Sequence, residues 1–138
     1  MATQVQNQST AGKLNLLHTA LRGNAIFSEA NGLLLLVAGA PIAEFLGVAE
    51  AGLLMRIIGV ALLGYGVFLY FFAERTLLGA GYLATAGDIA WVVGTIIVIV
   101  ADPFGLSTAG KWAILFIGDA VALFAVAQII GIRRLRRQ

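Results

Sequence analysis

Four ionisable side chains stand inside long apolar stretches of this sequence, where they could bind or carry charge. They are Glu29, Arg56, Asp88 and Asp119. A charge near the centre of a bilayer costs about 2.5–3.5 kcal/mol on insertion scales, so a charged residue there usually has a partner or a function. These four residues form the candidate intramembrane polar site.

Glu29 and Asp88 lie at matched depths, each roughly 8–9 Å inside an apolar stretch at 1.5 Å per helical residue. Two close carboxylates cannot both ionise cheaply, so the pair could share a proton or bind a cation. In the alternative, which the sequence favours, they pair with Arg22 and Arg75 and anchor the helix ends at the membrane interface.

Arg56 stands a few residues inside the opposite end of its stretch, whereas Asp119 lies close to the midplane. We hypothesise that they form an interhelical ion pair, because a lone buried charge is the costly state. Alternatively, Arg56 extends to the headgroups and Asp119 is protonated and hydrogen-bonded to a backbone carbonyl. The sequence leaves both alternatives open.

Polar residues also recur at helical spacing. One stripe holds Asn24, Ser28 and Asn31, and a second holds Asp88, Trp91 and Thr95. Such stripes can line a wet cavity, but in membranes they more often make hydrogen bonds between helices.

Several kinds of chemistry are excluded or disfavoured. The chain has no Cys, and its one His is His18, so no thiolate site, catalytic triad or bis-histidine haem can be assembled. We expect no enzyme, cofactor or metal. With 60% hydrophobic and 12% charged residues, the composition also rules out a cytosolic fold and a nucleic-acid binder.

The elements that must position these residues are four apolar stretches, each near the roughly 20 residues that span a bilayer. They cover about 24–47, 53–73, 82–101 and 111–132. They are apolar all round rather than alternating, which predicts helices and not barrel strands. We expect Pro41 to kink the first span or end it near Ala40, with 42–47 as a short surface helix. The fold class is therefore all-α, a four-transmembrane-helix bundle.

The predicted domains are a polar tail over 1–23, the transmembrane domain over 24–132 and a basic tail over 133–138. Within the first tail, Lys13–Arg22 carries Leu14, Leu17 and Leu21 on one face, which fits a short interfacial helix. A solvated extension of the first span fits equally well.

Basic residues predict the orientation. Seven lie on the side of the termini and of the loop between spans two and three, whereas Arg56 and Lys111 lie on the other side. The positive-inside rule therefore places both termini in the cytoplasm. The tail arginines Arg133, Arg134, Arg136 and Arg137 suit anionic lipid headgroups, at roughly 1 kcal/mol each. Nucleic-acid binding would need a basic face with aromatics, which the tail lacks.

Two further patterns concern packing. A shift of 59 residues aligns spans one and two with spans three and four, which suggests a tandem two-helix repeat or chance identity between apolar sequences. Small residues recur at four-residue spacing, which lets helices approach closely inside the bundle or between copies. These runs are Gly39, Ala43 and Gly47; Ala86, Ala90 and Gly94; and Gly118 with Ala122. We expect the same close packing from three glycines of the second span, Gly59, Gly64 and Gly66.

Four segments carry a family resemblance: LRGNAIFSEANGLLLL, LLMRIIGVALLGYG, DIAWVVG and AQIIGIRRLRR. The chain from Leu21 onward resembles small, functionally uncharacterised four-helix integral membrane proteins of bacteria, and it is similar to DoxX-like proteins in architecture alone. The resemblance implies a multi-pass protein of the bacterial inner membrane. We expect a non-enzymatic scaffold that self-associates or joins other membrane subunits. The alternative is a small proton- or cation-coupled transporter or channel.

Overall fold

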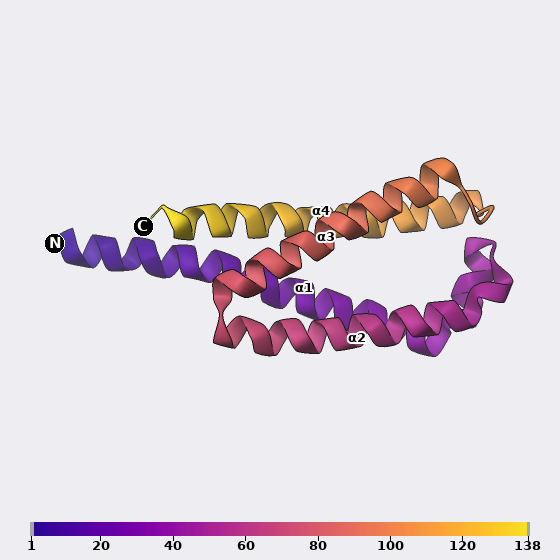
Figure 1. The fold of residues 1–138 in the computed structure, drawn as a ribbon, viewed down its shortest axis with the longest axis horizontal. Coiled ribbons are helices and arrows are strands. Elements are labelled where there is room, and N and C mark those ends of the chain that lie inside the picture. Colours follow the sequence, from indigo (N-terminus) through magenta and orange to yellow (C-terminus); the bar gives the residue numbers. More distant parts are fainter. Residues whose placement is uncertain (1, 138) are drawn as a thin grey trace.

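The computed structural model describes the backbone of residues 2–137 and the side chains of residues 16–137. This part of the chain is all-helical (Figure 1). Its elements are α1 (Ala2–Leu46), a short 3-10 helix η1 (Ala49–Ala51), α2 (Gly52–Arg75), α3 (Leu77–Ala101) and α4 (Thr108–Arg136). The segments long and apolar enough to cross a membrane are Leu16–Leu46, Ala49–Arg75, Leu77–Ala101 and Thr108–Arg136. The predicted all-α fold, with four helices long and apolar enough to span a membrane, is confirmed.

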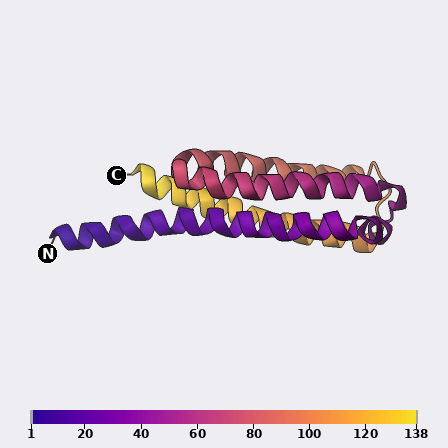
Figure 2. The same cartoon turned by 90° about the horizontal axis from the view of Figure 1, so that it is seen from below.

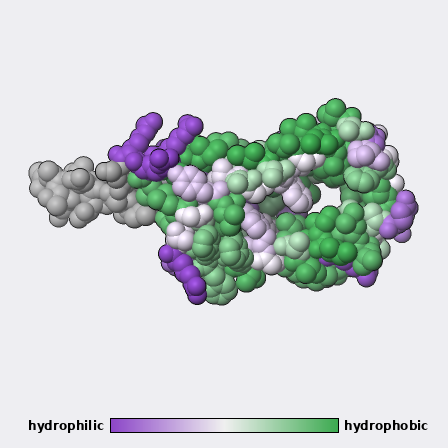
Figure 3. Space-filling model, viewed as in Figure 1, coloured by the Kyte–Doolittle hydropathy of each residue, from purple (hydrophilic) through white to green (hydrophobic). Residues whose placement is uncertain are grey.

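The helices form two antiparallel hairpins, α1–α2 and α3–α4, joined mainly where α1 packs on α4 (Figures 1 and 2). Both chain ends and the α2–α3 turn lie at one end of the bundle, the termini end, and η1 and residues 102–107 lie at the other, the loop end. From their turn, α2 and α3 diverge toward the loop end, and the space-filling surface is open between the hairpins there (Figure 3). In the described chain the backbones of α2 and α4 do not approach each other closely.

Helix α1 bends near Pro41. Ala38, three residues earlier, has non-helical angles (φ −110°, ψ 25°), because a proline ring clashes with the preceding turn and removes one helical hydrogen bond. The expected kink is confirmed. The helix then continues to Leu46, and Ala43 and Leu46 are buried. The Ser107 amide donates to the Leu46 carbonyl at 2.8 Å, so this segment packs into the bundle rather than forming a separate surface helix.

The prediction for Lys13–Arg22, an interfacial helix or a solvated extension of the first span, is corrected by the structure. Helix α1 runs through Lys13–Arg22 without a break, so no separate interfacial helix forms. The extension is packed rather than solvated: Leu17 is 0% and Leu21 1% exposed. The reason is that these leucines join a core cluster with residues of the other three helices, among them Leu69 of α2, Ala80 of α3 and Ile132 of α4. A Cβ on Gly131 of α4 would lie 2.9 Å from the Leu17 side chain.

Helices α1 and α2 approach through small residues that face one another at seven-residue intervals. The pairs are Ala25 with Gly66, Gly32 with Gly59, and Gly39 with Gly52. A Cβ on Gly32 would lie 2.8 Å from the Gly59 carbonyl, and a Cβ on Gly59 would lie 2.7 Å from the Gly32 carbonyl. The two backbones are therefore in direct contact, which is how helices pack tightly in a solvent as apolar as their side chains.

Candidate functional site

A buried carboxylate joins three helices inside the bundle. Asp88 of α3 accepts from the Asn24 amide of α1 at 3.0 Å and 2.8 Å, one bond to each carboxylate oxygen. Its Oδ2 also accepts from the Gln128 amide of α4 at 3.0 Å. Asp88 is 4%, Asn24 1% and Gln128 0% exposed. Both carboxylate oxygens are thus bonded without an arginine or lysine.

Two hydroxyls extend this arrangement. Ser28 donates to the Asn24 amide oxygen at 3.4 Å, and Thr85 donates to the Gln128 amide oxygen at 3.1 Å. We call the five residues Asn24, Ser28, Thr85, Asp88 and Gln128 the polar cluster. Each amide donates to Asp88 from its nitrogen and accepts from a hydroxyl at its oxygen, so both ends of each amide are hydrogen-bonded. A satisfied network is the form in which polar groups are tolerated in an apolar interior.

The depth of Asp88 differs from the prediction. Helix α3 begins at Leu77, earlier than the apolar stretch that starts near Tyr82. Asp88 therefore lies about 16 Å along the helix, at 1.5 Å per residue, and not at 8–9 Å. This depth is well inside the apolar span Leu77–Ala101.

The remaining helix, α2, places Tyr65 next to the polar cluster. Its hydroxyl is buried and has no hydrogen-bond partner among the described residues. It lies 3.6 Å from where a Cβ on Gly87 would stand, and its neighbours include Asn24 and Asp88 of the polar cluster. An unpartnered hydroxyl here is a cost to stability, because a buried polar group gains nothing to replace its lost hydration.

Glu29 is not part of the polar cluster. Its side chain lies on Gly66 of α2, where a Cβ would come within 2.6 Å of the Glu29 Cγ. No contact joins Glu29 to Asp88 in the described chain, so the predicted shared proton or cation site is not formed. The alternative pairing with arginine also fails. Arg22 faces Glu74 at 3.4 Å, and Asp88 is held by amides.

The hypothesised pair of Arg56 and Asp119 is also not formed. Both side chains are exposed, and they belong to α2 and α4, whose backbones do not approach each other closely. The aliphatic part of Arg56 covers Gly39 of α1 instead. Asp119 lies beside Trp112 and Phe116 in a shallow surface hollow on α4. The prediction was wrong because spacing along a span gives depth but not which helices are neighbours.

The two polar stripes are only partly inward-facing. Their members Asn24 and Asp88 meet in the hydrogen bonds described above. Thr95 is buried against Gly118 of α4. Trp91, by contrast, is 39% exposed, and the Asn31 amide donates to the carbonyl of Phe27 one turn earlier in α1. The stripes therefore serve contacts between helices, with no continuous polar path along them.

Sequence reasoning missed Gln128 and Thr85. It ranked intramembrane residues by charge, and neither residue is ionisable. The available signal was the cost of burying an amide: Gln128 is a primary amide inside an apolar stretch, and such a group needs partners for two donors and one acceptor. That signal predicts a partner but does not identify it as Asp88.

Charged contacts lie at the two ends of the bundle. At the termini end, Glu74 accepts from His18 at 3.3 Å and from Arg22 at 3.4 Å. At the loop end, Lys111 donates to Asp102 at 2.6 Å, and the Leu106 amide donates to the same carboxylate at 2.9 Å. The Lys111 bond and then the backbone bond hold the pKa of Asp102 below its ordinary value. No group of three potential metal ligands occurs in the described residues.

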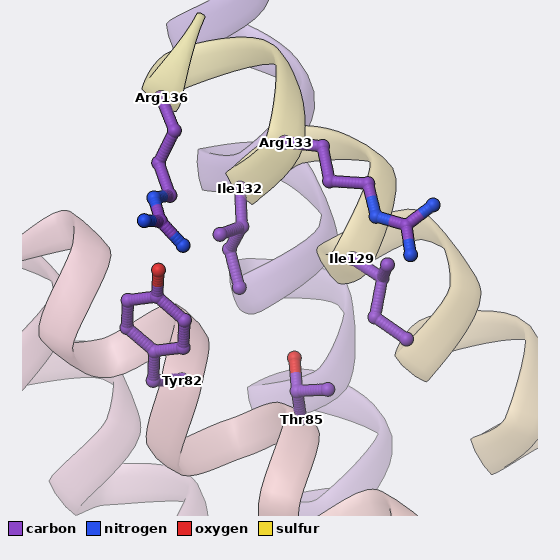
Figure 4. A pocket seen from close by; sticks show the side chains of 6 residues that line it. All are labelled: Tyr82, Thr85, Ile129, Ile132, Arg133 and Arg136. Atoms are coloured by element: carbon purple, nitrogen blue, oxygen red, sulfur yellow. The ribbon is translucent and has the colours of Figure 1, made fainter.

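A groove between α3 and α4 opens at the termini end, and its volume is about 200 Å³ (Figure 4). Tyr82, Thr85, Ile129, Ile132, Arg133 and Arg136 line it. Thr85 thus belongs both to this groove and to the polar cluster, which connects the groove to Asp88 through Gln128.

Comparison with known proteins adds no identity: no protein-family model, curated protein or solved structure matches this chain.

Proposed function

We propose that this protein is a non-enzymatic membrane scaffold that self-associates through α3 or docks there on other membrane subunits. One observation carries the proposal. The run Ala86, Ala90 and Gly94 faces outward, and a Cβ on Gly94 would have nothing within 4 Å. The runs around Gly39 and Gly118 are used inside the bundle. A small-residue face left free on a membrane helix allows close approach of another helix.

The polar cluster supports a structural role for the buried charge. The three amide N–H bonds to Asp88 come from two other helices, so the carboxylate ties α1, α3 and α4 together. Interhelical hydrogen bonds in membranes contribute about 0.6 kcal/mol on average, and at most about 1.7. Together they suffice to set helix register and rotation, and with them the direction in which the α3 face points.

The proposal places both termini in the cytoplasm of a bacterial inner membrane. The shared position of the chain ends and of most arginines at the termini end supports this orientation. A tandem two-helix duplication belongs to the same proposal, since each half of the chain forms an antiparallel hairpin.

Energy transfer between two differently labelled copies, reconstituted together at high lipid dilution, tests the self-association. Ala90→Leu adds bulk to the free α3 face and should lower energy transfer markedly. Ala61→Leu adds the same bulk to an exposed position on α2 and should leave it unchanged. Energy transfer in the wild type no greater than that expected from random proximity would refute self-association, and an equal loss in both variants would refute the α3 interface.

A second candidate is a small proton- or cation-coupled transporter, because Thr85 and Gln128 connect Asp88 to a surface groove. The measurement is proton and cation flux into liposomes that contain wild type, Asp88→Asn or, as control, Asp119→Asn. Flux that is lost only in Asp88→Asn would favour transport over the scaffold. Absence of flux in the wild type would rule out this candidate.

A further inference from the structure

We infer that the α3–α4 groove at the termini end is a binding site for one anionic phospholipid. The headgroup phosphate would lie between Arg136 and the Tyr82 hydroxyl, with Arg133 adding positive charge to the lining, and an acyl chain would lie on Ile129 (Figure 4). This inference is independent of the proposed scaffold function.

The charge of the groove points to an anion. Arg133 and Arg136 are exposed, and neither takes part in an ion pair of the described chain, whose pairs use His18, Arg22 and Lys111. No carboxylate lines the groove. Two uncompensated guanidinium groups in the lining give the groove a positive charge that suits a phosphate, which arginine binds through paired N–H donors.

The positions of the side chains favour one rim for the headgroup. In Figure 4 the Arg136 guanidinium points toward the Tyr82 hydroxyl across the opening, from α4 to α3. A phosphate oxygen between them could accept from both. Arg133 extends on the other side of Ile132, away from this rim, and adds positive charge to the lining of the groove. Two donors from two helices thus face one location.

The depth and the lining select a lipid over a free anion. Tyr82 lies about 8 Å along α3 from Leu77, at 1.5 Å per residue, a level where tyrosine commonly meets headgroups. Ile129 and Ile132 line the groove below the arginines, and α4 continues from there into the apolar span. The groove therefore changes from cationic to apolar in the direction in which a phospholipid changes from headgroup to chain.

Two double variants separate a defined site from general attraction to the basic tail. Arg133→Gln/Arg136→Gln removes two charges that line the groove, and Arg134→Gln/Arg137→Gln removes two charges from the same tail that do not. Purified protein in neutral detergent is titrated with phosphatidylglycerol or phosphatidylcholine at about 0.15 M salt, where charges beyond about 8 Å are screened. Bound lipid is counted by native mass spectrometry.

We expect one phosphatidylglycerol to bind ahead of any phosphatidylcholine. The groove variant should weaken this binding about 30-fold, from roughly two arginine contributions, and the control variant by much less. Equal weakening in both variants would overturn the site in favour of a diffuse tail effect. Equal binding of phosphatidylcholine would overturn its anionic specificity.

Two additional variants test the remaining parts of the site. Tyr82→Phe removes only the hydroxyl and should weaken phosphatidylglycerol several-fold, whereas Ile129→Trp fills the apolar part and should exclude the lipid. Glycerol phosphate, which has the headgroup without chains, should compete poorly with the lipid. If it competes as well as phosphatidylglycerol, the groove is an anion site and the lipid assignment is wrong. Unchanged helical circular dichroism in each variant confirms that the fold is retained.

Discussion

The tight contact between α1 and α2 makes a quantitative prediction for Gly59. A Cβ at this position would lie 2.7 Å from both the Gly32 carbonyl oxygen and the Leu36 amide nitrogen. Both are backbone atoms of α1, so no side-chain rotation relieves the clash. Accommodating one methyl group requires the two helices to separate along their contact.

The expected change in the stability of Gly59→Ala follows from two opposing contributions. Overpacking a tight interface costs typically about 1–3 kcal/mol. Replacing glycine by alanine inside a helix returns up to about 1 kcal/mol, because alanine restricts the unfolded chain and favours the helix. Gly59→Ala should therefore destabilise the protein by about 1–2 kcal/mol, despite its better helix propensity.

Gly64, in the same helix, is the matched control. The sequence suggested that it also packs, but a Cβ there would have nothing within 4 Å. Gly64→Ala should be neutral or stabilise by up to about 1 kcal/mol. The assay is unfolding of detergent-solubilised protein by a denaturing detergent, followed by circular dichroism. Equal stability of the two variants would refute the backbone-to-backbone contact, and so would a loss in Gly64→Ala alone.

Three other results are expected. Asp88→Leu should lower the free energy of unfolding by about 1–3 kcal/mol more than Asp88→Asn, since only leucine leaves buried amides without an acceptor. This loss of stability should shrink when Gln128→Leu is added. Strict additivity of the two substitutions in denaturant titrations would argue against the hydrogen bond between Asp88 and Gln128. Tyr65→Phe should raise the melting temperature slightly, because it removes an unpartnered buried hydroxyl, and a clear drop would mean that the hydroxyl has a partner. Lys111 lowers the pKa of Asp102, so the carboxylate stabilises the loop fully above its ordinary pKa of 3.8. This stabilisation is lost as the pH falls through the lower pKa of the folded protein. Carboxyl NMR should show the Asp102 pKa rising toward 3.8 in Lys111→Met, and an unchanged titration would contradict the pairing.

The hydrophobicity of the sequence predicted that four helices exist, but it did not predict their lengths. The apolar stretches located all four helices, because burial in hydrocarbon requires long apolar runs with internally bonded backbones. Their ends were misplaced where polar residues continue a helix beyond the apolar part, as in Lys13–Arg22. Those residues remain helical because Leu17 and Leu21 are buried in a core cluster with residues of α2, α3 and α4, which are distant parts of the chain.

The sequence by itself therefore determined that this chain is helical and apolar enough to cross a membrane four times, and it identified Asp88 as a charge needing explanation. Only the tertiary structure decided how that charge is satisfied. The partners, Asn24 and Gln128, lie on two other helices, and hydrogen bonds act over about 3 Å. Depth along a span can be counted from sequence, whereas neighbours depend on how the helices pack. For the same reason Arg56 and Asp119, on helices whose backbones do not approach each other closely, remain apart.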